Sequence, residues 1–281
     1  MNKPLIISLS SIPPRFDSVY QTLESLLSQD VKIDLIELNI SKRYRRFPNY
    51  SGGLPKIPAG VRVRIVEEEW GPATKILPGI LEYALENVEI LYCDDDRICP
   101  PNWARSFLRT REYRPEDAIA SSGWHVSGLG IIYGNKQMQP RAIRMKSLFD
   151  LKYRMNRFSQ SIRSFHNKQI EPKPPRHRQY WKSGYVDIAE GCGGVMITPK
   201  MFDPTVFKIP DRLWSVDDIW LSGMLAYNGI GIWADKYGVC PQEPQYASAP
   251  LWQAVIDGFD RQQANQACAQ YLQKNYAVWS D

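Results

Sequence analysis

The chain has 281 residues, of which 43% are hydrophobic and 12% aromatic, which is typical of one folded domain and excludes a disordered protein. No run approaches the ~18 apolar residues that a membrane-spanning helix needs, and the first residues do not resemble a signal peptide. The five cysteines are odd in number and scattered without zinc spacing, which indicates a reducing, cytoplasmic compartment.

The net charge of +5 is distributed unevenly along the chain. Residues 141–182 contain twelve Lys or Arg against only Asp150 and Glu171, which gives this segment +10 and leaves −5 for the rest. A strongly basic segment on an acidic body indicates an anionic partner for that segment.

Strands and helices are expected to alternate in the first third of the chain. The expected elements are a strand over 3–9, a helix from Asp17 or Ser18 to Gln29, strands over 33–40 and 61–66, a helix from about 72 to 86, and a strand over 88–93. This order is typical of an α/β fold with mostly parallel connections.

The rest of the chain is expected to complete the same domain. The expected elements are a helix over 103–111, a strand over 118–122, a partly helical basic insertion over 141–182, short strands around a glycine turn within 186–197, a helix over 216–226, a strand over 229–234 and a closing helix within 251–276. The glycine-rich stretch 123–140 favours no particular element.

The apolar run 88–93 ends in three consecutive carboxylates, Asp94, Asp95 and Asp96. Unpaired carboxylates are costly to bury, and ligands of open α/β sheets bind at the carboxyl ends of the strands. Because neighbours in an extended chain point to opposite sides, Asp94 and Asp96 are expected to face one way and Asp95 the other. Two such carboxylates would suit Mg²⁺ or Mn²⁺, and the alternative is a solvated acidic turn.

Basic and acidic residues at two predicted helix starts are further candidates. Lys75 is expected in the first turn of the helix that begins near Pro72, where free N–H groups and the helix dipole favour an anion. Asp217 and Asp218 are expected in the first turn of another helix, where they could act as a general base or simply as helix-capping acids.

Five short motifs, in this order and spacing, resemble the nucleotide-sugar glycosyltransferases of the GT-A fold, specifically the inverting family-2-like group. The motifs are SLSSIPPRF (8–16), GPATK (71–75), YCDDD (92–96), EGCGGV (190–195) and DDIWLSGML (217–225). The resemblance covers roughly residues 5–235. It implies an α/β GT-A-like nucleotide-binding fold whose central sheet is mostly parallel and flanked by helices.

The resemblance also implies a role for each motif. Asp218 would be the catalytic base with Asp217 orienting it, Asp96 would hold the Mn²⁺ or Mg²⁺ ion together with Asp94, and Asp94 would also contact the ribose. The remaining donor-binding candidates are Ser8, Ser10, Arg15, Lys75, Asp95, Glu190, Gly193 and Gly194. Trp124, Trp214 and Trp220 could stack on sugar rings or lie buried, and His125, His166 and His177 are expected at the surface or on the acceptor side.

The expected organisation is a single domain over 1–281. Its parts are a donor-binding part (about 1–125), the basic insertion (about 141–182), an acceptor and catalytic part (about 183–250) and a C-terminal helix (about 251–279). The basic insertion could hold an anionic acceptor, contact an anionic membrane at its inner face, or have no partner. No nucleic-acid motif accompanies its charge, so nucleic acid is not expected.

The expected function is metal-dependent transfer of a sugar from a nucleotide donor, for which a UDP-sugar is favoured, to a hydroxyl acceptor with inversion. The acceptor would be a glycan, a glycolipid or another hydroxyl compound in bacterial-type surface glycan synthesis. One alternative is a nucleotidyltransferase of sugar metabolism, although Ser10 to Phe16 lack the glycine-rich loop of such enzymes. Another is a non-catalytic nucleotide-sugar- or glycan-binding protein on the same fold.

Overall fold

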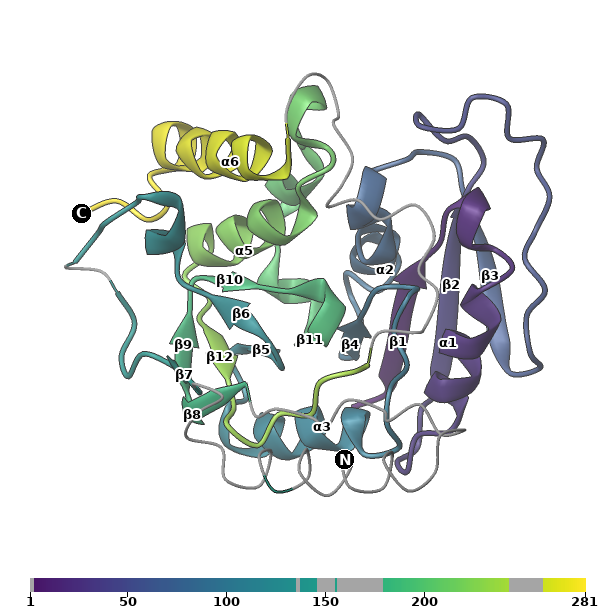
Figure 1. Cartoon of the computed structure of the whole chain (residues 1–281), viewed down its shortest axis with the longest axis horizontal. Coiled ribbons are helices and arrows are strands. Elements are labelled where there is room, and N and C mark those ends of the chain that lie inside the picture. The colour runs from purple at the N-terminus through teal and green to yellow at the C-terminus, as the bar shows by residue number, and fades with distance from the viewer. Residues whose placement is uncertain (1–2, 135–136, 146–154, 156–178, 243–259) are drawn as a thin grey trace.

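The computed structural model describes residues 3–134, 137–145, 155, 179–242 and 260–281 (Figure 1). Within these residues a single eight-stranded sheet runs through the protein, in the order β3-β2-β1-β4-β11-β5-β12-β9. Its strands are β1 (Leu5–Ser10), β2 (Leu35–Ser41), β3 (Val61–Val66), β4 (Glu89–Tyr92), β5 (Ala118–Ala120), β9 (Gly184–Val186), β11 (Val195–Ile197) and β12 (Ile232–Ala234).

The central sheet is mostly parallel, as the sequence predicts. Strands β3, β2, β1 and β4 pair in parallel with one another, and so do β5 and β12. Strand β11 lies between the two parallel groups and is antiparallel to both β4 and β5, so the two groups run in the same direction. Strand β9 forms the edge of the sheet and is antiparallel to β12. Strand β1 is buried on both faces, because Leu5, Ile7 and Leu9 pack on one face of the sheet and Ile6 on the other.

Helices cover both faces of the sheet and bury its apolar side chains. One face packs against α1 (Val19–Leu27) and α3 (Trp103–Tyr113), and the other against α2 (Leu77–Glu82), α5 (Asp217–Tyr227) and α6 (Arg261–Tyr276). Figure 1 shows α5 and α6 above the sheet and α3 below it. Helix α1 buries the predicted stripe of Val19, Leu23 and Leu26.

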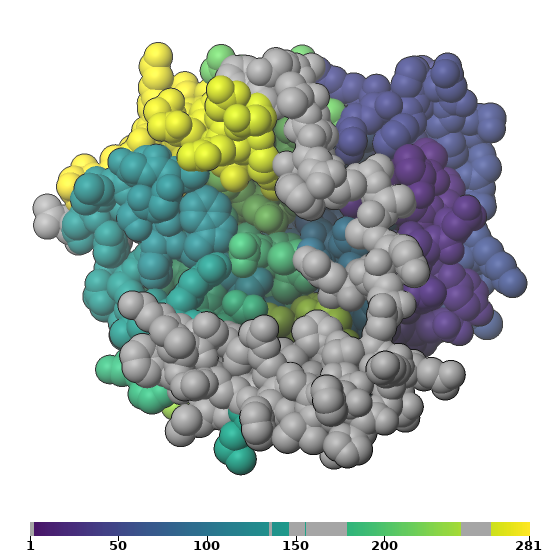
Figure 2. All heavy atoms as spheres, in the orientation of Figure 1, coloured from purple at the N-terminus to yellow at the C-terminus, as the bar shows by residue number. Residues whose placement is uncertain are grey.

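Helix α6, near the C-terminus, packs against α5. Leu272 of α6 lies against Gly223 of α5, where any larger side chain would overlap it. Trp220 of α5 stacks edge-on against Tyr276. In Figure 2 the surface of α6 is continuous with that of the segment around Val126–Leu129, which α6 also contacts. Helices α5 and α6 therefore share one core.

The helix expected from about 72 to 86 is wrong in its extent. Gly71–Lys75 forms a 3-10 helix, Ile76 separates it from α2, and α2 ends at Glu82. Pro78 explains the break, because a proline inside a continuous helix would remove one backbone hydrogen bond and clash with the preceding turn. Lys75 therefore ends a 3-10 helix and does not lie in the first turn of an α-helix.

The other expected elements that fall in the described residues are present, with ends shifted by a few residues. The stretch 123–140 contains β6 (Gly123–Trp124), which pairs with β10 (Ile188–Ala189), and a 3-10 helix (Val126–Leu129). The ends of the basic segment pair as β7 (Ile143–Arg144) and β8 (Tyr180–Lys182). The partly helical interior expected for that segment, with His166 and His177, lies outside the described residues, as does the expected helix start near 251. None of the described helices is long and apolar enough to cross a membrane.

Candidate functional site

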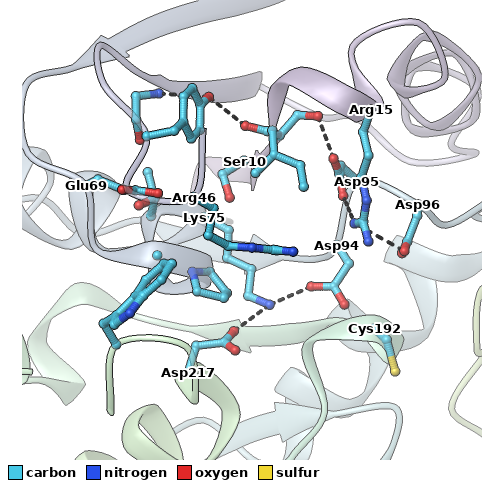
Figure 3. A pocket seen from close by; sticks show the side chains of 18 of the residues that line it. Ser10, Arg15, Arg46, Glu69, Lys75, Asp94, Asp95, Asp96, Cys192 and Asp217 are labelled. Carbon is cyan, nitrogen blue, oxygen red and sulfur yellow. Dashed lines mark hydrogen bonds and ion pairs between the residues drawn. The ribbon is translucent and has the colours of Figure 1, made fainter. Parts of the chain in front are cut away.

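A pocket of about 340 Å³ opens where strands β1, β2 and β4 end. This is the carboxyl edge of the parallel strands, where open α/β sheets bind ligands. The polar side chains that line it come from seven parts of the chain: Ser10, Ser11, Arg15, Ser41, Tyr44, Arg46, Glu69, Thr74, Lys75, Asp94, Asp95, Asp96, Arg97, Cys192, Asp217, Asp218 and Arg261. Loops from both halves of the sheet therefore build one site (Figure 3).

The acidic triplet does not divide as the extended-chain argument predicts. Strand β4 ends at Tyr92, and the backbone turns at Asp95 and Asp96. The guanidinium of Arg15 consequently reaches both of these neighbours, with Nη1 2.6 Å from Asp95 and 3.2 Å from Asp96, while Asp94 pairs with Lys75 instead (Figure 3). The expectation that Asp95 faces away from Asp94 and Asp96 is therefore wrong, because all three residues line the same pocket.

Arg15 and Asp95 form a buried pair that fixes the loop after β1 to the loop after β4. The Asp95 carboxylate also accepts a hydrogen bond from the Ser11 hydroxyl at 2.5 Å, and its main-chain carbonyl accepts one from Thr22 of α1 at 2.7 Å. Burial raises the pKa of Asp95 despite Arg15. Burial alone would lower the pKa of Arg15, but Asp95 and Asp96 outweigh it and raise that pKa. Arg15 is thus held by the protein's own carboxylates.

Lys75 bridges two carboxylates from opposite halves of the sheet. Its ammonium lies 2.5 Å from Asp94 and 2.7 Å from Asp217, and its side chain is only 5% exposed. Burial opposes the charged form of Lys75, but Asp217, Asp94 and Asp218 outweigh burial and raise its pKa. Burial would likewise raise the pKa of Asp94, but Lys75 outweighs it and lowers that pKa. The charge of Lys75 is therefore already compensated inside the site.

Asp218 lies next to this bridge and is half-buried in the pocket wall. Its Oδ1 accepts a hydrogen bond from the Gly191 main-chain N–H at 2.9 Å. Burial, together with repulsion from Asp217, raises the pKa of Asp218 to about 7. At the start of α5, Asp217 is therefore paired with Lys75, whereas Asp218 titrates near neutral pH.

The loop after β1 contributes its predicted residues unequally. Ser10 lines the pocket, whereas Ser8 is buried beneath it, where its hydroxyl donates to the Lys75 carbonyl at 2.6 Å and accepts from Asn39 at 3.1 Å. Ser8 therefore supports the backbone at Lys75 and does not itself line the pocket.

The glycine turn after β10 lies beside the pocket, and only Cys192 of this turn lines it. A side chain at Gly191 would overlap the Lys75 ammonium, so this glycine makes room for the bridge. Gly194 has φ +94° and lies against the Trp103 ring, which any side chain would overlap. Gly193 accepts hydrogen bonds at its carbonyl from Trp103 and Ser121. These glycines have structural roles behind the pocket.

Glu190 lies outside the pocket lining, with its carboxylate 3.5 Å from Arg144 of β7. Of the tryptophans considered for sugar stacking, Trp220 is fully buried, and Trp214 is buried but lines the pocket, with the Arg45 guanidinium 5.2 Å from its ring centroid. His125 does not line the pocket and lies 3.7 Å from Asp187.

Sequence reasoning missed four charged pocket residues: Arg97, which directly follows the acidic triplet, and Arg46, Glu69 and Arg261. Arg46 follows β2 within a few residues, so the rule that ligands bind at the carboxyl ends of parallel strands could have found it. Glu69 accepts a hydrogen bond from the Arg45 main-chain N–H at 2.6 Å, and burial raises its pKa. Arg261 begins α6 and binds the Ser215 carbonyl at 2.7 Å. No local motif distinguishes the last two.

The carboxylates of the acidic turn fit a small divalent cation as a partial site. Oδ1 of Asp96 is buried and accepts no hydrogen bond from the described residues, with the Arg97 guanidinium 3.4 Å away. Asp94 uses one oxygen, Oδ1, toward Lys75. The described residues offer no cluster of three acidic, histidine or cysteine ligands. Mg²⁺ commonly takes one or two protein carboxylates and completes its shell with phosphate and water, so two acids are sufficient.

No protein-family model and no curated protein matches this sequence. Similar solved structures include that of S. aureus TarS 1–349, which is 13% identical with a TM-score of 0.42 and covers 86% of this chain and 60% of that one. Its complex with UDP-GlcNAc is 13% identical with a TM-score of 0.45, covering 91% and 62%, and its complex with UDP is 12% identical with a TM-score of 0.41, covering 85% and 59%. The chain thus spans less than two thirds of each of these structures.

Proposed function

We propose that this protein transfers a sugar from a nucleoside-diphosphate donor, of which a UDP-sugar is the favoured class, to a hydroxyl acceptor. One observation carries the proposal: residues of three distant motifs line a single pocket at the carboxyl edge of the sheet. Arg15 comes from the loop after β1, Asp94 and Asp96 from the turn after β4, and Asp218 from the start of α5. A pocket of about 340 Å³ is within the usual range for small-molecule sites.

Asp218 is the proposed general base. A base works best when its pKa lies near the working pH, and Asp218 has a pKa of about 7. The Gly191 N–H fixes the orientation of its carboxylate through Oδ1, which leaves Oδ2 for the acceptor hydroxyl. The acceptor oxygen would attack the anomeric carbon as Asp218 takes its proton, and the bond from that carbon to the donor phosphate would break, which gives inversion.

Lys75 and Asp217 are proposed to position this base. Lys75 binds both Asp217 and Asp94, so its single positive charge offsets part of the negative charge beside Asp218. A Mn²⁺ or Mg²⁺ ion held by Asp96 and Asp94 would supply Lewis-acid stabilisation of the departing diphosphate. Asp95 and Arg15 would keep the acidic turn in place. Ser10 is proposed to contact the donor, and no donor contact is proposed for Ser8, Glu190, Gly193 or Gly194.

The acceptor class and the cellular setting are also proposals. A glycan, glycolipid or similar hydroxyl compound is proposed as acceptor, and the +10 charge of residues 141–182 favours an anionic one. The same segment would allow peripheral contact with an anionic membrane surface from the cytoplasmic side.

Thermal unfolding with ligands tests the donor proposal. The folded protein is heated with UDP, GDP, CMP, ADP or dTDP, with and without Mn²⁺, because a ligand of the folded state raises the midpoint by mass action. A rise with one diphosphate that needs Mn²⁺ and is lost in Asp96→Ala is expected. No rise with any nucleotide would rule out a donor site.

The Asp218→Asn variant separates an enzyme from a binding protein. It should bind the nucleotide as the wild type does and lose sugar transfer, whereas a non-catalytic binding protein shows no transfer in either form. A nucleotidyltransferase would instead release pyrophosphate from a nucleoside triphosphate, which the same preparations can be assayed for.

A further inference from the structure

Five basic side chains line the pocket, and four of them are held by the protein itself. Arg15 binds Asp95 and Asp96, and Lys75 binds Asp94 and Asp217. Arg97 lies 3.4 Å from the Asp96 carboxylate, and Arg261 donates to the Ser215 carbonyl. The fifth is Arg46, whose guanidinium lies 5.4 Å from the centroid of the Phe47 ring but makes no hydrogen bond or ion pair with any described residue.

Arg46 reaches into the pocket from the loop after β2. Figure 3 shows its side chain extending past Lys75 toward the acidic turn. The side chain is half-buried, and burial and repulsion from Arg15 lower its pKa. The nearby Glu69 carboxylate offsets part of this effect. Keeping the guanidinium here without an ion pair to a described residue still costs free energy, because part of its hydration is lost and a second cation lies nearby. An anion bound in the pocket would remove this cost.

We propose that Arg46 binds the phosphates of a nucleoside diphosphate in this pocket; this inference rests on the proposed function. The assignment replaces the expectation that Lys75 and Arg15 perform this task, since the charges of both are already compensated by carboxylates. A guanidinium presents planar, paired donors that match phosphate oxygens, and such charge-assisted bonds are the strong ones. During transfer, Arg46 would stabilise the charge that grows on the leaving diphosphate.

The chemistry of the pocket favours a polyanion over a single carboxylate. Arg46 shares the pocket with the proposed metal carboxylates Asp94 and Asp96, so one ligand group has to satisfy a guanidinium and a hard cation together. A diphosphate has enough oxygens to do both. A lone carboxylate has only two oxygens, so it could not give the guanidinium a paired contact and also bind the cation through separate oxygens.

Calorimetric titration with uridine, UMP and UDP in the presence of Mn²⁺ tests the role of Arg46. In the wild type, affinity should increase with each added phosphate. In Arg46→Gln, affinity for UDP should fall by about tenfold to a hundredfold while affinity for uridine stays unchanged, because one charge-assisted bond pair is lost. Arg46→Lys should fall between the two, since it keeps the charge but loses the paired geometry.

Arg43 provides the matched control. It lies in the same loop, is exposed, and does not line the pocket, so Arg43→Gln removes the same charge without touching the site. It should bind UDP as the wild type does. Arg46→Gln should unfold at or above the wild-type temperature, because it removes repulsion from Arg15 and breaks no hydrogen bond or ion pair with the described residues. If Arg46→Gln unfolds at a lower temperature, Arg46→Lys takes its place in the test.

The outcomes are distinguishable. If the wild type binds none of the three compounds, the proposed function fails and this inference with it. If the wild type binds UDP more tightly than uridine and Arg46→Gln keeps that difference, the proposed function stands and the role of Arg46 is overturned. A loss of UDP affinity in Arg43→Gln equal to that in Arg46→Gln would also overturn it, since the effect would then come from net charge alone.

Discussion

The ammonium of Lys75 lies 2.7 Å from the carboxylate of Asp217, and this contact joins the two halves of the sheet at the pocket. Lys75 ends the 3-10 helix before α2, whereas Asp217 begins α5. Both side chains are almost fully buried, at 5% and 4% exposure. Asp217 is compensated by Lys75, and Lys75 by Asp217 together with Asp94, so the relative position of the two halves depends on these contacts.

Removing the Lys75 charge should destabilise the protein strongly. Lys75→Met leaves Asp217 buried without its counter-ion, which is expected to lower the free energy of unfolding by about 3–5 kcal/mol. Denaturant unfolding measures this change. The exposed pair of Lys42 and Glu67 offers a control, and Lys42→Met should cost no more than about 1 kcal/mol.

The same pair can be tested by a double-mutant cycle. Asp217→Asn in the Lys75→Met background should restore part of the lost stability, because the uncompensated carboxylate is gone. Additive losses from the two substitutions would show that Lys75 and Asp217 do not interact energetically.

Catalytic efficiency should rise with pH through about 7. Asp218 has a pKa of about 7 in the free protein, so the basic form that the proposed mechanism needs becomes populated across that range. Asp218→Asn should reduce turnover by about 10²–10⁴-fold. The measurement is kcat/KM for sugar transfer against pH. A wild-type profile that is flat between about pH 5 and 8 would argue against Asp218 as the base.

Asp218 should also make stability fall as pH rises toward neutral. Between its ordinary pKa of about 4 and its folded value of about 7, the folded protein binds a proton that the unfolded chain has lost. Folding is therefore favoured at the acidic end of this window. Asp218→Asn lacks this penalty. Its unfolding midpoint should therefore rise relative to that of the wild type as the pH increases from 5 to 8. Asp211→Asn, which removes an exposed acid before α5, controls for the loss of one negative charge.

Gly194 should tolerate no side chain. Gly194→Ala places a methyl group into the Trp103 ring at a φ of +94°, so a loss of about 2–4 kcal/mol is expected. Gly52 provides a control with a similar φ of +89° but open space around it, and Gly52→Ala should cost only about 1–2 kcal/mol. Equal losses at the two positions, measured by thermal unfolding, would contradict the packing explanation.

The sequence by itself determined the order of the strands and helices and the mostly parallel sheet. It could do so because the signals are local: apolar residues at period two or in short runs make strands, and the stripe of Val19, Leu23 and Leu26 makes a helix. The acidic triplet at the end of β4 and the acid pair at the start of α5 were also visible, because each follows directly from the neighbouring residues.

Only the tertiary structure decided which charges are compensated. Ion pairs such as those of Arg15 with Asp95 and of Lys75 with Asp217 join residues far apart in the chain, so no local pattern contains them. The turn at Asp95 and Asp96 likewise replaced the straight strand end that the alternation rule assumes. Arg46 stands out as the pocket cation without an ion pair to a described residue only after these pairs are counted, since charge compensation depends on distance in space and not on spacing in sequence.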